Sequence, residues 1–145
     1  MDLEEVFFEI KAEGDFIKIV PQEFSYKNSD HSWDRNWITT EVIIKAGGFS
    51  GHYGAQFRTV DFKEFKKQLE YLYDHLDNSA IFEDLEHYLK VSIKGDGLGH
   101  FEIFCEVSDN PGYLERQLTF YLSIDQTYIP QLIRQLDGID REFHR

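Results

Sequence analysis

Two glycine-containing stretches hold residue types from which active sites are built. The first, Gly48–His52 (GFSGH), resembles the G-x-S-x-G turn of serine hydrolases, in which a strained strand-to-helix turn exposes a nucleophilic serine. The fifth position is His52 instead of glycine, and the preceding Gly47-Gly48 pair is a hairpin signal, so a strand follows. We therefore do not predict a catalytic nucleophile at Ser50.

The second stretch, Gly95–Gly99 (GDGLG), has three glycines and resembles a phosphate-binding loop. Such loops lead into a helix N-terminus, whose free amides bind the anion. Here a strand follows, and the carboxylate of Asp96 would repel phosphate. The glycines are better explained as turn positions with positive φ.

Residues that commonly bind metals are scattered along the chain. The six histidines show no H-x-x-x-H or HExxH spacing, and no acidic loop matches the EF-hand pattern. The single cysteine, Cys105, has no disulfide partner, and its place on an alternating apolar strand predicts a small buried hydrophobe. We predict no metal, no cofactor and no enzymatic activity.

One pattern indicates recognition of another protein. Alternation along the expected strands puts aromatic rings and carboxylates on the sheet face opposite the helices, the composition of an interface with aromatic anchors and a charged rim. The residues that we expect to bind a partner come from this face and from the loop around Trp33–Trp37, and they are Asp30, Trp33, Asp34, Trp37, Glu102, Phe104, Glu106 and Tyr121. The alternative is that the first two strands, or the loop around Trp33, fold over this face and bury it.

The charge of the chain restricts the class of partner. The 145 residues include 15 Lys+Arg and 27 Asp+Glu, which gives a formal net charge of −12. This charge argues against binding to nucleic acid or anionic lipid and favours a basic protein, although solubility alone also explains it. The acidic N-terminal stretch has no signal-peptide pattern and no apolar run approaches 18 residues, so we expect a cytoplasmic protein.

Strands are the main elements that must position these residues. Pro21 is expected to end the second strand, because proline cannot donate to a central ladder, and residues 22–36 should form a surface loop. Val91–Val107 reads as one hairpin around the glycine-rich turn, and Asp109–Gly112 as another turn. The expected strands cover residues 5–10, 16–20, 38–46, 49–60, 79–83, 85–94, the second half of the hairpin, and 114–124.

Two stretches change to the helical period. In the first, Asp61 is the expected N-cap, and the helix should end near Asp77. A second apolar stripe, Ile129–Ile139, predicts another helix with its N-cap within Asp125–Thr127, and Gly138 should mark its end. The stripe of the first helix consists of Phe62, Phe65, Leu69, Leu72 and Leu76.

These elements predict the fold class. Tight turns between neighbouring strands favour an antiparallel sheet over a parallel one. We predict one α+β domain over residues 1–145, built from an antiparallel β-meander sheet with two amphipathic helices packed on one face. The sequence shows no linker and no internal repeat.

An ordered set of short motifs resembles the WapI-like family of bacterial immunity proteins. The motifs cover about Trp33 to Ile139 and are mostly turn and cap residues, so they indicate the fold better than a binding site. The resemblance implies a cytoplasmic, non-enzymatic antidote to a contact-dependent polymorphic toxin, encoded beside the toxin and binding its C-terminal domain, which is often a nuclease. The motifs are Trp33-Asp34 with Asn36-Trp37, Ala46–Gly51, Asp61-Phe62, Gly95–Gly97 with Gly99-His100, and Asp125–Pro130.

Two other functions stay open on the residues alone. One is a small-ligand-binding or enzymatic domain that uses a pocket between sheet and helices. The other is an assembly module, which would form a stable homo-oligomer. As an immunity protein, the chain is expected to be a monomer or weak homodimer outside its complex with the toxin.

Overall fold

The computed structural model describes residues 5–27, 31 and 34–144. In this part of the chain, eight strands, two α-helices and two short 3-10 helices follow one another. They are β1 (Phe8–Ala12), β2 (Asp15–Phe24), η1 (Asp34–Asn36), β3 (Trp37–Ala46), β4 (Phe49–Arg58), α1 (Thr59–Asp74), β5 (Ser79–Glu83), β6 (Leu89–Gly95), β7 (His100–Ser108), β8 (Gln117–Asp125), η2 (Gln126–Tyr128) and α2 (Ile129–Glu142).

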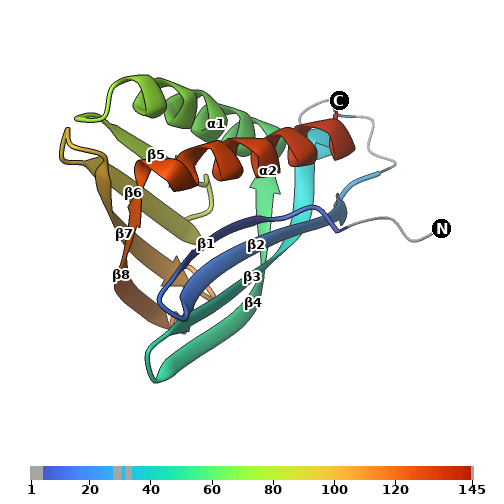
Figure 1. The fold of residues 1–145 in the computed structure, drawn as a ribbon. Helices are drawn as coiled ribbons and strands as arrows, with labels where there is room; N and C mark the ends of the chain where they lie inside the picture. Colours follow the sequence, from blue (N-terminus) through green and yellow to red (C-terminus); the bar gives the residue numbers. More distant parts are fainter. Residues whose placement is uncertain (1–4, 28–30, 32–33, 145) are drawn as a thin grey trace.

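The strands form two four-stranded sheets, which corrects the prediction of a single sheet. Neighbouring strands are antiparallel, and the order in each sheet follows the chain, β1-β2-β3-β4 and β5-β6-β7-β8. The sixteen residues of α1 separate them. A helix of that length spans about 24 Å, so it carries the chain away from β4 before β5 begins a new sheet (Figure 1). The α+β class is confirmed.

Each half of the chain has the same order of elements, four strands followed by a helix. Figure 1 shows α1 and α2 side by side, with α1 in contact with β5 and α2 in contact with β1. Lys66 of α1 bridges the helices, because its Nζ lies 2.5 Å from Asp137 and 3.6 Å from Asp140. The hydrogen bond to Asp137 raises the pKa of Lys66 above its ordinary value.

An aromatic cluster joins both sheets to α1. The ring of Phe82 on β5 lies 5.3 Å from Phe57 on β4 and 5.6 Å from both Phe62 and Phe65 on α1. Phe65 in turn meets Phe8 of β1 at 5.3 Å. These edge-to-face and tilted contacts are the favoured geometry for aromatic pairs. The space between α1 and the two sheets is thus filled by side chains, which counts against a ligand pocket there.

The alternation predicted for the strand after Gly99 is confirmed in β7. Phe101, Ile103, Cys105 and Val107 all point into the core and are buried. Burial raises the pKa of the Cys105 thiol to about 12, so the thiol stays protonated at neutral pH. The residues between them point to the opposite side of the sheet.

The first helix begins earlier than predicted. It starts at Thr59 with Arg58 as the N-cap, and Asp61 is the third helical residue, not the cap. The Asp61 carboxylate accepts hydrogen bonds from the backbone N–H of Arg58 at 2.8 Å and from its guanidinium at 3.0 Å. The carboxylate therefore acts from inside the first turn, where negative charge also favours the helix dipole. The helix ends at Asp74, so Leu76 packs against the core from beyond it.

The second helix continues past its predicted end. Asp125 caps as expected, but it caps η2, where it accepts a hydrogen bond from the N–H of Thr127 at 2.9 Å. Gly138 lies inside α2, because the buried side chains of Ile139 and Phe143 extend the apolar stripe beyond it. That burial outweighs the cost of about 1 kcal/mol for an internal glycine. Neither helix in the described ranges is long and apolar enough to cross a membrane.

Pro21 does not end β2, contrary to the prediction. The strand continues to Phe24, and the pairing with β3 shifts register between Pro21 and Glu23. An irregularity of this kind accommodates a residue that has no N–H to donate. The longer strand brings Ser25 to the start of β3, where its N–H donates to the carbonyl of Trp37 at 2.9 Å.

Candidate partner-binding surface

The exposed side of the second sheet carries a regular grid of side chains. The antiparallel register aligns one outward residue from each of β5, β6, β7 and β8 in every row across the sheet. We call these twelve residues the β5–β8 outer face. Its three rows are Glu83-Lys90-Glu106-Thr119, Ile81-Ser92-Phe104-Tyr121 and Ser79-Lys94-Glu102-Ser123.

The middle row is the apolar part of this face. Phe104 and Tyr121 are direct cross-strand partners, and their rings lie 4.8 Å apart with an angle of 32° between them. Tyr121 is 62% exposed, whereas Phe104 is half-buried beside it. Ser92 on the other side of Phe104 is too small to cover the ring. The structure thus places two of the residues expected from the sequence in one exposed aromatic pair.

The outer rows place charge on both sides of the aromatic pair. Lys90 lies between Glu83 and Glu106, and Lys94 is opposite Glu102. Opposite charges on directly paired residues of neighbouring strands attract each other. The rows hold three carboxylates and two ammonium groups, so they form a weakly acidic border, and Glu102 and Glu106 lie in it on either side of Phe104.

A recess of about 200 Å³ adjoins this face where β7 and β8 are connected. Gln117 and Ser108 donate hydrogen bonds to Glu115 at 2.7 and 3.0 Å, which hold the pKa of Glu115 below its ordinary value. The volume is below the roughly 300 Å³ of typical small-molecule pockets. Within the described ranges, no three His, Cys, Asp or Glu side chains are grouped to bind a metal. The lining includes Glu83, His87, Lys90, Glu106 and Glu115.

Trp37 and Asp34 lie elsewhere, so the prediction that Trp37 shares one sheet face with Phe104 and Tyr121 is wrong. Trp37 begins β3 in the first sheet, and the guanidinium of Arg58 lies over its indole at 6.0 Å. Asp34 precedes it in η1. The prediction failed because it assumed one sheet, in which all outward residues would share a side. Asp30 and Trp33 are outside the described residues.

The N-terminal strands do not cover the β5–β8 outer face. They form the first sheet, in which β1 contacts the edge strand β8 of the other sheet, and Glu13 and Asp15 at the turn between β1 and β2 line a recess with Glu102 and Tyr121. The turn lies beside Tyr121, which stays largely exposed. For these strands, the alternative in which the face is buried is therefore wrong.

Several residues of this surface were missed from the sequence. Ile81 and Glu83 alternate with buried Ala80 and Phe82, a signal that was present in the sequence. Their neighbours across the sheet, however, depend on which strand pairs with β6, and alternation alone does not give that pairing. The β7–β8 loop was predicted only as a turn.

The architecture, two four-stranded antiparallel sheets with a helix after each, defines the fold class. The structure of the plant transcriptional regulator PBF-2 shares it with a TM-score of 0.56 and 12% identity, over 99% of this chain and 92% of that one. MRP1/MRP2 of Trypanosoma brucei gives a TM-score of 0.53 and 10% identity, over 97% of this chain and 88% of that one. At these identities the likeness concerns the fold alone.

The family is shown by the sequence itself. Residues 7–144 match the model of the Immunity protein WapI-like family, and the chain belongs to this family. The match confirms the resemblance found in the motifs and extends it into the first 30 residues, where no motif was recognised. No curated protein matches the sequence.

Proposed function

We propose that this chain is an immunity protein that binds the C-terminal domain of a toxin encoded beside it and neutralises that domain by covering it. The observation that carries the proposal is the Phe104–Tyr121 pair, exposed in the middle of the β5–β8 outer face and bordered by charged rows. Membership in the WapI-like family supports a toxin domain as the partner.

The aromatic pair supplies the anchors. Interfaces gain most of their affinity from a few aromatic or arginine side chains that become fully desolvated, while the surrounding polar residues exclude water. Most of the surface of Tyr121 is exposed and is available for burial by a partner. Phe104, on the neighbouring strand, packs against the Tyr121 ring and holds that ring in place. The pair lies on β7 and β8, which are hydrogen-bonded to each other in the sheet. Its position is therefore fixed before binding.

The charge favours a basic partner. A formal net charge of −12 accelerates encounter with a basic domain, and the carboxylates of Glu102 and Glu106 border the anchors. Toxin domains that act on nucleic acid are themselves basic, so a nuclease-type toxin suits this surface. The proposed action is non-covalent and non-enzymatic, and it takes place in the cytoplasm of the producing cell.

Co-expression with the toxin encoded by the neighbouring gene tests this function. Cells that express the toxin's C-terminal domain should survive when this chain is present, and the two purified proteins should form a tight 1:1 complex. Tyr121→Ala should reduce both protection and affinity, whereas Tyr73→Ala, an exposed tyrosine on α1, serves as the matched control. Absence of both protection and complex formation would refute the proposal.

One observation favours the assembly module as a second candidate. β4 is an edge strand of the first sheet, and Phe49 at its start is largely exposed. A free edge is a template for pairing with another strand. A concentration-independent dimer in light scattering that Phe49→Ser dissociates would support assembly, and a monomer at all concentrations would exclude it.

A further inference from the structure

We propose that the β7–β8 loop, Asp109–Arg116, is a preformed anchor that inserts Tyr113 and Leu114 into an apolar pocket with a basic rim on the toxin domain. This inference rests on the proposed function and deepens it, because it adds a second contact to the β5–β8 outer face.

The loop presents the two apolar side chains to solvent. Tyr113 is 72% exposed, and its neighbour in the chain, Leu114, is 70% exposed. The loop connects β7 and β8, the two strands that carry the aromatic pair. Its base adjoins the row that contains Glu106 and Thr119, so one partner can contact the face and the loop together.

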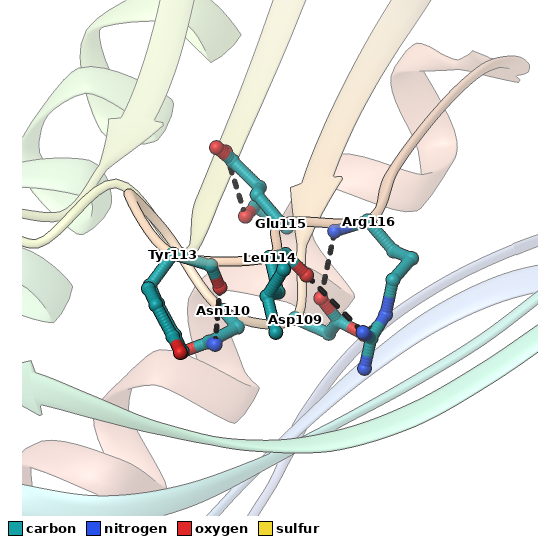
Figure 2. A network of polar contacts seen from close by, with 7 residues as sticks. Asp109, Asn110, Tyr113, Leu114, Glu115 and Arg116 are labelled. Carbon is teal, nitrogen blue, oxygen red and sulfur yellow. Dashed lines mark hydrogen bonds and ion pairs between the residues drawn. The ribbon is translucent and has the colours of Figure 1, made fainter.

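An ion pair closes the base of the loop. The Asp109 carboxylate accepts a hydrogen bond from the backbone N–H of Arg116 at 3.0 Å and pairs with its guanidinium at 2.9 Å. The guanidinium also donates to the carbonyl of Leu114 at 3.1 Å. Figure 2 shows these groups facing one another across the loop, so Arg116 fixes the backbone directly beside the exposed leucine.

A second set of contacts fixes the other side of the loop. Glu115 accepts hydrogen bonds from the hydroxyl of Ser108 and from the side chain of Gln117. Asn110 and Tyr113 bond to each other, with the N–H of Tyr113 donating to the Asn110 carbonyl at 3.3 Å and the Asn110 amide donating back to the Tyr113 carbonyl (Figure 2). A loop held on both sides loses little conformational entropy on binding.

The residue type at position 114 is the strongest indication of a role outside the fold. Leu114 has φ +48°, in the left-handed region that glycine and asparagine adopt most easily. A leucine there is unfavourable in its backbone conformation, and its side chain contributes little to the core because it is exposed. Glycine would adopt this backbone conformation at lower cost in a turn with only a structural role. We therefore explain the presence of a leucine side chain at position 114 by contact with a partner.

Charge specifies the pocket that receives the loop. The recess at the loop base is lined by three carboxylates, those of Glu83, Glu106 and Glu115, which outnumber its one lysine, Lys90, and it also includes His87. The one arginine of the loop, Arg116, is paired with Asp109. An incoming surface therefore meets apolar tips with carboxylates beneath them, which fits an apolar pocket surrounded by lysine or arginine.

Affinity measurements with the purified C-terminal domain of the neighbouring toxin test the loop. Tyr113→Ala and Leu114→Ala should each weaken binding at least tenfold, mainly through faster dissociation. Tyr73→Ala on α1 and Leu98→Ala in the β6–β7 turn, at the opposite end of the sheet, are matched exposed controls and should stay within twofold of wild type. Equal effects of loop and control variants would overturn the inference.

A second variant separates binding from folding. Leu114→Gly removes the side chain and also relieves the left-handed backbone, so its melting temperature should equal or exceed that of wild type while its affinity falls at least tenfold. Full affinity in Leu114→Gly would overturn the inference whatever the stability.

The two proposals fail in different ways in the same assay. If wild type does not bind the toxin domain, both are overturned. If wild type binds and Tyr121→Ala weakens the complex while Tyr113→Ala and Leu114→Ala match their controls, the face is supported and the loop anchor alone is overturned.

Discussion

The two sheets of this molecule share strand order and antiparallel pairing, yet their exposed sides differ. On the first sheet, Phe16 is half-buried and lies between Lys11 and Lys45 in its row, two residues whose long aliphatic stems are able to cover apolar surface. On the second sheet, Phe104 lies between Ser92 and Tyr121, which leaves an open aromatic surface. Topology thus repeats, whereas the outward residues decide which sheet is suited to bind a partner.

Charge differs between the two sides as well. The rows of the first sheet hold four basic residues, Lys11, Lys18, Lys45 and Arg58, and three acidic ones, Glu9, Glu23 and Glu41, so basic residues exceed acidic ones by one. The β5–β8 outer face has an excess of glutamate. In a chain with net charge −12, the first sheet is therefore the side where a basic partner is least favoured. The comparison predicts effects that are large in the core, intermediate on the second sheet and small on the first.

The largest effect is expected where the two sheets meet. Phe82→Ala should reduce the free energy of unfolding by about 3–5 kcal/mol, because Phe82 is fully buried between β4, β5 and α1. Ile81→Ala, the neighbour on the opposite face, should cost less than about 1 kcal/mol. Urea denaturation measures both, and similar losses would mean that the sheet faces are assigned wrongly.

The next effect distinguishes the two sheets in binding. Tyr121→Ala and Phe104→Ala should each weaken the toxin complex by about 1–3 kcal/mol, as for aromatic anchors. Trp37→Ala should change affinity by less than about 0.5 kcal/mol, because Trp37 belongs to the first sheet and contacts Arg58. Calorimetry with folded variants provides the test, and a larger loss for Trp37→Ala would move the interface to the first sheet.

A smaller effect is expected from charge alone. Replacing both Glu102 and Glu106 by Gln should slow association about threefold to tenfold at low salt, and the difference should shrink as salt screens the charges. Glu9→Gln on the first sheet is the control and should be nearly silent. Stopped-flow association rates at two ionic strengths decide this, since equal slowing by the control would show only a net-charge effect.

The smallest effect concerns pH. The hydrogen bond from the Arg116 N–H, and the ion pair with its side chain, hold the pKa of Asp109 below its ordinary value. A carboxyl with a lowered folded-state pKa stabilises the loop above its unfolded-state pKa, and this is lost as pH falls through the folded-state value. The Asp109 carboxyl should therefore titrate at lower pH than a free aspartate in an NMR titration. An ordinary pKa would show that the base of the loop is open.

The sequence predicted burial best within strands, where alternation along the strand decides which side chains face the core. Alternation gave the buried side of β7, and by exclusion the outward positions of Phe104 and Tyr121. Local rules failed where tertiary packing competes with them. Gly138 stays in α2 because Ile139 and Phe143 find buried sites, and Pro21 stays in β2 because the strand shifts register.

The candidate site was only partly predictable for a similar reason. Trp37 and Tyr121 alternate outward in the same way, and nothing local tells that they belong to different sheets. That division follows from α1, which carries the chain away from the end of β4, so that β5 pairs with β6 in a second sheet. The proposed loop anchor could not be predicted from the sequence, because leucine disfavours the left-handed backbone conformation that Leu114 adopts.

The burial of Cys105 has a consequence for how the molecule responds to oxidants. The only thiol of the chain faces the core directly behind the outer face and stays protonated, and oxidation proceeds through the thiolate. Oxidation at Cys105 is therefore disfavoured in the folded chain. Because Cys105 is buried, a cysteine introduced at position 98 or at position 113 would be the single reactive thiol of the chain. Its labelling rate would report whether a partner covers the β6–β7 end or the β7–β8 end of the sheet.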